Sequence, residues 1–386
     1  MILFGSAWGV VSAFLVFVTG FVVSFALARR FLVSKQVSLF LYLWHTILCV
    51  LYCLYVINDN GDAIMYYRAS FSSHINVSLG TSFVVYLVSF LTKGVGLSFL
   101  GAFLVFNIIG FIGLLSFWGV LRQVVQERSR AIQRMAFFVV LLPSVSFWTS
   151  ALGKDALAFL SVGLALWAAS DMRRRIFLMF FSIIVMLCVR PHMAALMVFS
   201  LLVFYVVKRD VPVFSRFTLA ALSLVASVFV VPLALNYAGL SGDASLNQID
   251  EYIEQRQSFN QGGGGGINIA TMSFPVKVFT YIFRPLPFEA RSLFQFLASV
   301  ENVFFLFLFT CVSVRFLKLK KIKFFHDNSF ILSYAFTSWV ILALTTANFG
   351  IAARQKWMFL PMLLVMAFSI IGTRREGASV SEARAI

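Results

Sequence analysis

Long apolar runs alternate with short polar connections along almost the whole chain. A helix that crosses a bilayer needs about 20 predominantly apolar residues, because each residue adds about 1.5 Å to its length. Measured against that length, the pattern predicts an all-α bundle of about 11 membrane-crossing helices. The predicted spans are residues 7–28, 38–57, 97–121, 135–152, 156–170, 176–189, 193–207, 217–236, 296–314, 329–347 and 357–372.

Composition supports the same class. Of the 386 residues, 61% are hydrophobic and only 12% are charged, and the mean hydropathy is +0.93. Soluble domains contain about 25% charged residues and about 45–50% apolar residues, so this inventory could not cover a water-facing surface. We therefore expect residues 1–386 to form a single integral membrane domain.

Three segments fall outside the predicted spans. Residues 58–82 and 237–295 form two long loops on the predicted outer side, and residues 373–386 form a cytoplasmic tail. The first loop continues into an apolar stretch, 83–93, that is too short to cross a bilayer and is expected to lie as a helix in the interface. The second loop contains Gly262–Gly266, which lacks the Lys and Ser/Thr of a P-loop and is typical of a flexible connection.

Charge gives the predicted orientation. The net charge is +16. The basic residues lie between apolar runs instead of on one soluble face, which argues against nucleic acid as a partner. About two thirds of them fall in alternate connections, which the positive-inside rule assigns to the cytoplasm. The pattern predicts a multi-pass protein of a bacterial inner membrane, with a periplasmic N-terminus and a cytoplasmic C-terminus.

The charged residues of the predicted outer side need a further explanation, because charge at the end of a span is costly to bury. Asp62, Tyr66 and Arg68 follow the second span directly. The carboxylate could act as a base or bind sugar hydroxyls, or it could simply cap the following helix. Lys154 and Asp155 lie in a tight turn between two spans, where they could hold an anion or neutralise each other.

Three more polar segments lie on the same predicted side. Arg190 and His192 flank Pro191 in an apolar run that would otherwise be one helix, and proline forces a break there. Arg190 could bind a phosphate through two donors, or extend to the lipid headgroups. The other two segments carry Arg284, Glu289 and Arg291, with Glu301 in the next span, and Arg354 and Lys356 before the last span.

The later segments also allow a structural interpretation. The two prolines at 285 and 287 predict a rigid, extended segment that presents Arg284 with Glu289 nearby, either as a functional group or as a structural elbow. Arg354 and Lys356 either form an anion-binding site at the start of the last helix or anchor that helix at the membrane surface. No metal-ligand spacing or nucleotide-binding glycine pattern is present, so we expect no metal and no cofactor.

Several cations at membrane depth on one side predict a ligand that is an anion attached to a lipid, such as a polyprenyl diphosphate. Arg190, Arg284, Arg354 and Lys154 would neutralise the charge that develops on the departing diphosphate. Asp62 or Glu289 would accept the proton of the incoming sugar hydroxyl. The remaining candidates would contact diphosphate or sugar: Arg68, Tyr66, Asp155, His192, Arg291 and Lys356.

A family resemblance supports this interpretation. Residues Pro143–Asp155, reading PSVSFWTSALGKD, resemble the P-S-x-x-F-W-x-S-x-x-x-K-D/E segment of bacterial polysaccharide polymerases of the Wzy type and their EpsG-like relatives. The segments RPH, RPLPFEA and GIAARQK are similar to two Arg-Pro segments of that family and to its Arg before the final span. The segment from Asp62 to Tyr66 resembles the family's early outer loop, whereas the glycine run departs from the pattern.

The resemblance implies a GT-C-like, multi-span glycosyltransferase that joins polyprenyl-diphosphate-linked oligosaccharide units on the periplasmic face, during O-antigen, capsule or exopolysaccharide synthesis. It implies arginines in outer loops as the essential residues, which are Arg190, Arg284 and Arg354 here, and chain-length regulators or flippases as possible partners besides membrane lipid. Two alternatives remain: a flippase or transporter of a lipid-linked glycan, and a non-enzymatic scaffold of a polysaccharide secretion complex.

Overall fold

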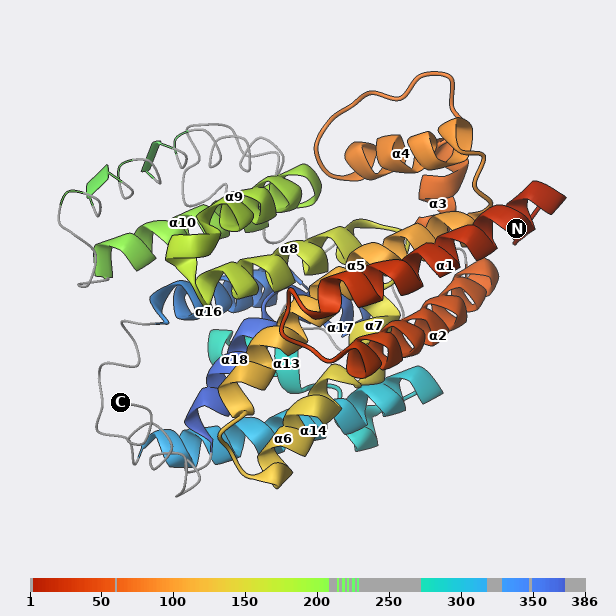
Figure 1. The fold of residues 1–386 in the computed structure, drawn as a ribbon. Helices are drawn as coiled ribbons and strands as arrows, with labels where there is room; N and C mark the ends of the chain where they lie inside the picture. Colours follow the sequence, from red (N-terminus) through yellow and green to blue (C-terminus); the bar gives the residue numbers. More distant parts are fainter. Residues whose placement is uncertain are drawn as a thin grey trace.

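The computed structural model describes residues 3–59, 61–207, 272–317, 328–346 and 349–371, with a few positions between 214 and 228. Over these residues the regular elements are all helical, and no strand is present (Figure 1). The helices are α1 (Ala7–Ala28), α2 (Lys35–Asp59), α3 (Asp62–Ala69), α4 (Thr81–Ser89), η1 (Phe90–Gly94), α5 (Phe99–Val125), α6 (Arg130–Val140), α7 (Pro143–Thr149), α8 (Lys154–Ala169), α9 (Met172–Val189), α10 (Pro191–Val207), α13 (Phe274–Phe283), η3 (Pro287–Glu289), α14 (Leu293–Phe316), α16 (Ser329–Thr345), α17 (Phe349–Gln355), η4 (Lys356–Met358) and α18 (Leu360–Ile370).

The prediction of an all-helical membrane bundle is confirmed at the level of fold class. Within the described residues, five segments are long and apolar enough to cross a membrane: Ala7–Ala28, Lys35–Asn58, Phe99–Val125, Arg130–Thr149 and Leu293–Phe316. A sixth would be the pair Phe349–Met358 and Leu360–Ile370, which is bent by 63°. Several other predicted spans appear as shorter apolar helices, so the total of about 11 stays a prediction.

Parts of the predicted topology lie outside the described residues. These are most of the 217–236 span, residues 237–271 of the second outer loop and the 373–386 tail. The predicted interfacial helix 83–93 corresponds to α4 and η1, which together cover Thr81–Gly94.

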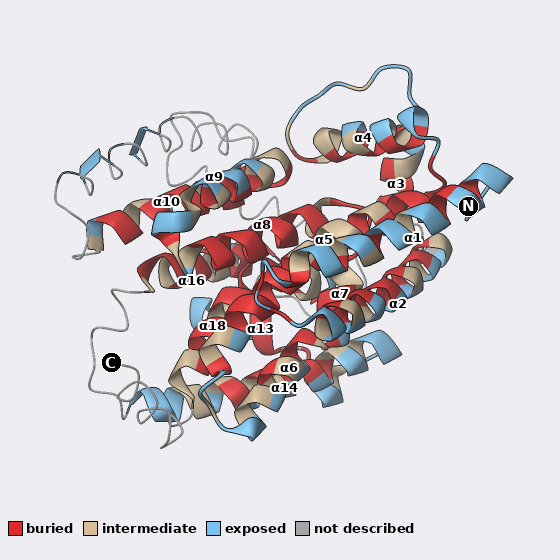
Figure 2. Ribbon diagram, in the orientation of Figure 1, coloured by how far each residue is buried: buried red, intermediate tan, exposed pale blue. Residues whose placement is uncertain are grey.

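The centre of the bundle is the packing of α5 against α8 (Figure 2). The two helices meet through glycines, which allow close approach of their backbones. A Cβ atom added at Gly163 of α8 would lie 2.4 Å from the carbonyl oxygen of Gly113 on α5. The outward faces of α1 and α2 remain exposed and apolar, as expected for helices that face lipid.

The predicted break at Pro191 is present. Helix α9 ends at Val189, Arg190 follows it with non-helical backbone angles (φ −146°, ψ 77°), and Pro191 is the first residue of α10. Proline lacks the N–H that a continuous helix would use, but it is tolerated in a first helical turn. The break therefore places the Arg190 side chain between two helices instead of on the face of one.

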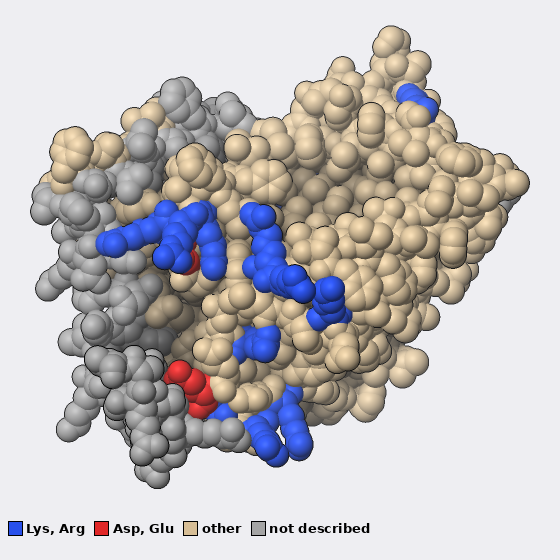
Figure 3. Space-filling view, in the orientation of Figure 1, with Lys and Arg blue, Asp and Glu red and all other residues tan. Residues whose placement is uncertain are grey.

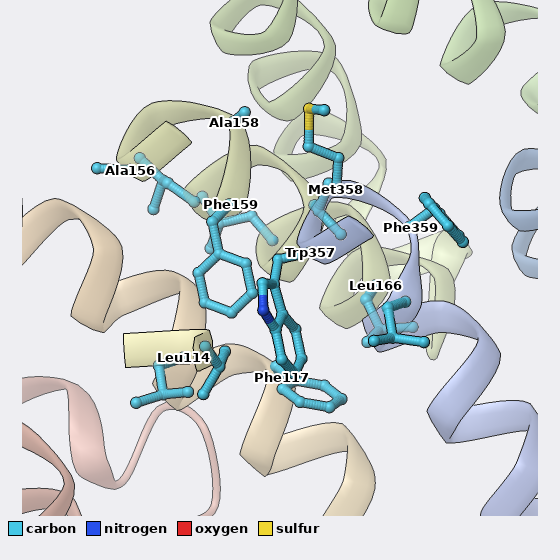
Figure 4. Close-up of a cluster of buried hydrophobic side chains, with 14 of the residues drawn as sticks. Leu114, Phe117, Ala156, Ala158, Phe159, Leu166, Trp357, Met358 and Phe359 are labelled. Carbon is cyan, nitrogen blue, oxygen red and sulfur yellow. The ribbon is translucent and has the colours of Figure 1, made fainter. Parts of the chain in front are cut away.

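The bend before α18 is anchored by Trp357. This residue is 1% exposed, and its ring lies close to Phe117 of α5 and to Phe159 and Leu166 of α8 (Figure 4). Aromatic side chains bury more apolar surface than any others, so Trp357 fixes the segment from α17 to η4 against the centre of the bundle.

Basic side chains are distributed unevenly over the visible surface. Lys and Arg gather on one half of the face in Figure 3, whereas the other half is almost free of charge. Such an asymmetry is typical of a protein that meets the cytoplasm at one end only.

Candidate functional site: a polar cavity beside an apolar groove

Charged residues from four separate segments line one small cavity of about 100 Å³. Asp62 comes from α3, Lys154 and Asp155 from the start of α8, Arg190 from the break between α9 and α10, and Arg354 from α17. The rest of the lining is formed by Tyr52, Ala63, Tyr66, Ala151, Leu152 and Gly153. The fold thus brings together charged residues that are up to 292 positions apart in the sequence.

A chain of ion pairs organises the cavity. Arg190 Nη2 lies 2.6 Å from Asp155 Oδ1, and Arg354 Nε lies 3.1 Å from Asp155 Oδ2. Arg354 Nη1 also donates a hydrogen bond of 3.0 Å to Asp62 Oδ2. Asp155 therefore joins two guanidinium groups, and Arg354 joins two carboxylates.

Burial differs along this chain of pairs. The side chains of Arg190 and Asp155 are only 9% and 12% exposed, whereas that of Asp62 is 56% exposed. Asp62 therefore forms the open rim of the cavity and Asp155 its inner wall. At the inner wall, Asp155 lies in the first turn of α8, where the helix dipole favours a negative charge.

The cavity retains capacity to bind an anion. Lys154, Arg190 and Arg354 supply three positive charges, and Asp62 and Asp155 supply two negative ones. Within the described residues, the Nε of Arg190 is buried and has no hydrogen-bond partner. An unsatisfied donor on a buried guanidinium is costly, and an anionic ligand would remove that cost.

The other predicted site residues of this region lie elsewhere. Arg68 is exposed in the last turn of α3, and His192 is partly buried in α10. Neither lines the cavity. Tyr66, by contrast, is buried and does line it, and a Cβ added at Gly153 would lie 3.3 Å from its ring. Sequence reasoning missed Tyr52, because a tyrosine near the end of an apolar run is usually an interfacial anchor.

Arg284 and Glu289 do not join the cavity; they bind each other. Arg284 Nε donates to both carboxylate oxygens of Glu289 at 3.0 Å, and the Leu286 amide donates to Glu289 Oε2 at 2.8 Å. The hydrogen bond from Arg284 holds the pKa of Glu289 below its ordinary value. The predicted proximity of the two side chains is present, whereas Arg291 is exposed and its backbone amide donates a hydrogen bond of 2.7 Å to Gln295 Oε1.

The prediction of an extended segment between the two prolines is wrong in part. Leu286 is extended, but Pro287–Glu289 form one turn of 3₁₀ helix, and the Arg284–Pro285 bond is cis. The turn forms because Pro287 occupies its first position and the Glu289 side chain accepts the free amide of Leu286.

An apolar groove of about 630 Å³ lies next to the polar cavity. The same elements line both: α17 presents Arg354 to the cavity and the neighbouring Ala353 to the groove, and α2 presents Tyr52 to the cavity and Leu51 to the groove. The groove walls are mainly aromatic and aliphatic and include Trp44, Phe147, Trp148, Phe294 and Phe349. Two charged residues, Glu301 and Lys356, also line it.

Lys356 therefore does not share an anion-binding site with Arg354, which was one of the two interpretations of the sequence. Its side chain is buried, donates a hydrogen bond of 3.0 Å to Asn302 Oδ1 and lies 5.1 Å from the centre of the Phe305 ring. The sequence did not predict Glu301 as a site residue, although a lone carboxylate inside an apolar run is a signal for one.

Among the described residues, no group of three or more His, Cys, Asp or Glu side chains could hold a metal ion. Comparisons of the chain with protein-family models, with curated proteins and with solved structures find no match.

Proposed function

We propose that the protein is a glycosyltransferase of the polymerase type, which joins oligosaccharide units carried on polyprenyl diphosphate at the periplasmic face of a bacterial inner membrane. One observation supports this function above the others. Arg190, Arg354 and Lys154 meet around a polar cavity, and that cavity borders an apolar groove lined by residues of three candidate membrane-crossing helices.

The two compartments suit the two parts of such a substrate. Guanidinium groups bind phosphate through pairs of parallel hydrogen bonds, and those of Arg190 and Arg354 converge on the cavity. The groove volume of about 630 Å³ lies within the range of small-molecule sites, about 300–1,000 Å³, and its walls suit a hydrocarbon chain. A lipid diphosphate would place its head in the cavity and part of its chain in the groove.

The chemistry needs one proton acceptor and one stabilised leaving group. The Asp62 carboxylate at the rim accepts the proton of an incoming sugar hydroxyl, and the hydroxyl oxygen forms a bond to the anomeric carbon of the donor sugar. The bond between that carbon and the diphosphate oxygen breaks, and its electron pair leaves with the lipid diphosphate. Arg190, Arg354 and Lys154 stabilise the negative charge that develops there. The proton then passes from Asp62 to water.

Glu289 was the other candidate base. Both of its oxygens accept hydrogen bonds from Arg284, and it does not line the cavity in which the diphosphate would bind. The proposal retains the GT-C-like class with about 11 spans and an outward-facing site, and chain-length regulators or flippases as possible partners.

The test is a comparison of glycans from cells without the gene and from cells with single variants. We expect the deletion, Arg190→Ala and Arg354→Ala all to lose long polymer and to accumulate single lipid-linked units on the periplasmic side. Removal of one charge-stabilising donor typically lowers turnover by about 10²–10³-fold. Arg134→Ala, at an exposed position of α6, is the control and should leave chain length unchanged.

Two results would contradict the proposal. Accumulation of single units on the cytoplasmic side would indicate a flippase. Normal chain lengths in both cavity variants, with the proteins inserted at wild-type levels, would remove the catalytic role and favour a scaffold.

A further inference from the structure

Two adjacent residues in the middle of α14 make contacts to three other segments. Glu301 Oε1 accepts the backbone amide of Ser144 at 3.0 Å, and Glu301 Oε2 accepts the Ser144 hydroxyl. Asn302 Oδ1 accepts Lys356 Nζ at 3.0 Å, and Asn302 Nδ2 donates to the Pro285 carbonyl at 3.1 Å. Neither residue lines the polar cavity.

The first contact fixes the start of α7. This helix begins at Pro143, and the residue before it, Leu142, has no side chain that could accept an N-terminal amide. Glu301 supplies that acceptor from α14, and its negative charge is favourable at a helix N-terminus. A short turn, residues 150–153, leads from α7 to Lys154 and Asp155 at the start of α8, which line the cavity.

The second contact fixes the other wall. Lys356 is two residues after Arg354, and its ammonium group is held by Asn302. The indole Nε1 of Trp357 donates a hydrogen bond of 3.2 Å to the Ser144 hydroxyl, which links the same segment to α7. One turn of α14 thus contacts the helix that precedes Asp155 and the segment that follows Arg354, and these two residues pair across the cavity at 3.1 Å.

The chemistry of this network goes beyond what helix packing requires. Glu301 and Lys356 are 7% and 2% exposed and lie in an otherwise apolar region. Buried charges are costly, and replacing such a network by apolar side chains is often neutral or stabilising. Polar side chains make directional contacts, however, which hold their partners in one position more closely than apolar packing does.

We propose that Glu301 and Asn302 are positioning residues, which set the spacing between Asp155 and Arg354 without touching the diphosphate. The inference rests on the proposed function, because it assumes that the cavity binds a diphosphate. Each residue acts through one intermediate: Glu301 through Ser144 and α7, and Asn302 through Lys356 and the end of α17. A shift of about 1 Å in a binding group can lower activity by about 10²-fold, so a contact outside the cavity has a measurable effect within it.

The experiment is a calorimetric titration of the full-length protein in lipid nanodiscs with inorganic diphosphate, which lacks the lipid chain. We expect Glu301→Gln and Asn302→Leu each to weaken diphosphate binding about tenfold, while thermal unfolding shows that both variants are folded. Ser299→Ala is the matched control, because Ser299 is buried on the same helix and its hydroxyl donates to the Phe296 carbonyl within that helix. It should bind diphosphate as the wild type does.

A double-mutant cycle separates positioning from general loosening. Ser144→Ala removes the hydrogen bond between the Ser144 hydroxyl and Glu301. It is the milder change and takes the place of Glu301→Gln if that variant does not fold. We expect the loss in the double variant Glu301→Gln/Ser144→Ala to be smaller than the sum of the two single losses, because both changes break the Glu301–Ser144 contact, although Ser144→Ala also removes the acceptor of the Trp357 indole. Additive losses would overturn the assignment to this contact.

The remaining outcomes are distinct. Wild-type diphosphate affinity in folded Glu301→Gln and Asn302→Leu, together with lost binding in Arg190→Ala, overturns the positioning role and leaves the proposed function intact. Failure of the wild-type protein to bind diphosphate removes the proposed anion site, and the positioning role with it.

Discussion

The two Arg-Pro segments of this protein look alike in sequence and differ in structure. Arg190 precedes Pro191, is 9% exposed and pairs with Asp155, a residue 35 positions earlier. Arg284 precedes Pro285, is 20% exposed and pairs with Glu289, a residue five positions later. Both arginines are held by a carboxylate, but only the first partner is remote in the sequence.

The difference lies in what each pair organises. A partner within the same turn satisfies the arginine locally, so the Arg284–Glu289 pair fixes the shape of one connection between α13 and α14. A partner on a distant helix must be brought into place by the whole bundle, and the space between the helices then becomes a cavity. An Arg-Pro break in an apolar run therefore indicates a site only when its charge partner is remote.

Removal of the shared carboxylate should have the largest effect. Asp155→Ala leaves two largely buried guanidinium groups, Arg190 and Arg354, without their common partner. Loss of one member of a buried pair costs about 3–5 kcal/mol, so we expect a marked fall in the thermal midpoint of the purified protein. Glu289→Ala leaves only one guanidinium group, that of Arg284, without its partner, so we expect a smaller fall in the thermal midpoint. Equal falls in the thermal midpoint of the two variants would show that the two Arg-Pro segments do not differ in how strongly their carboxylates stabilise the protein.

The second effect concerns the two candidate bases. Asp62→Asn keeps the shape of an exposed side chain but removes its ability to accept a proton. We expect stability to change by under about 1 kcal/mol, while polymer formation falls by about 10²-fold or more, the usual contribution of a general base. Glu289→Gln should leave polymer formation within about threefold of wild type. Chain-length profiles of the surface glycan measure both. A larger loss of polymer formation in Glu289→Gln than in Asp62→Asn would instead indicate that Glu289 is the base.

Much of the helical layout could be predicted from the sequence, because the apolar run that forms each helix lies within one continuous segment. The predicted span 38–57 became α2 (Lys35–Asp59), and the break at Pro191 followed from the chemistry of proline alone. The charged outer-side segments were also correctly singled out as unusual, since charge near a span is costly wherever it lies.

Which side chains pair with each other, and which line the same cavity, could not be predicted in the same way. Arg354 and Lys356 look like one cluster in the sequence, but residues two apart on a helix point about 200° away from each other. One therefore lines the polar cavity and the other the apolar groove. Glu301, Asn302 and Tyr52 lie inside apolar runs, and their roles depend on helices more than 50 residues away, as in the contact from Glu301 to Ser144.

The smallest effect is a pH dependence confined to the Arg284 segment. The hydrogen bond from Arg284 lowers the pKa of Glu289, so this pair contributes stability above the ordinary carboxyl value of 4.5 and loses that contribution as pH falls below it through the lowered pKa. The amide of Leu286, which donates to Glu289 Oε2, reports on the pair through hydrogen exchange.

After correction for the intrinsic exchange rate, protection of the Leu286 amide should be constant from pH 7 to about 5 and should fall below about pH 4. Glu289→Gln should remove this pH dependence, because the amide side chain does not titrate. The cavity pair of Arg190 and Asp155 is held by the surrounding helices as well as by charge, so amides at the start of α8 should keep their protection over the same range. A parallel loss of protection at both places would mean that the two arginine pairs are energetically one unit, and the contrast between a local and a remote partner would no longer hold.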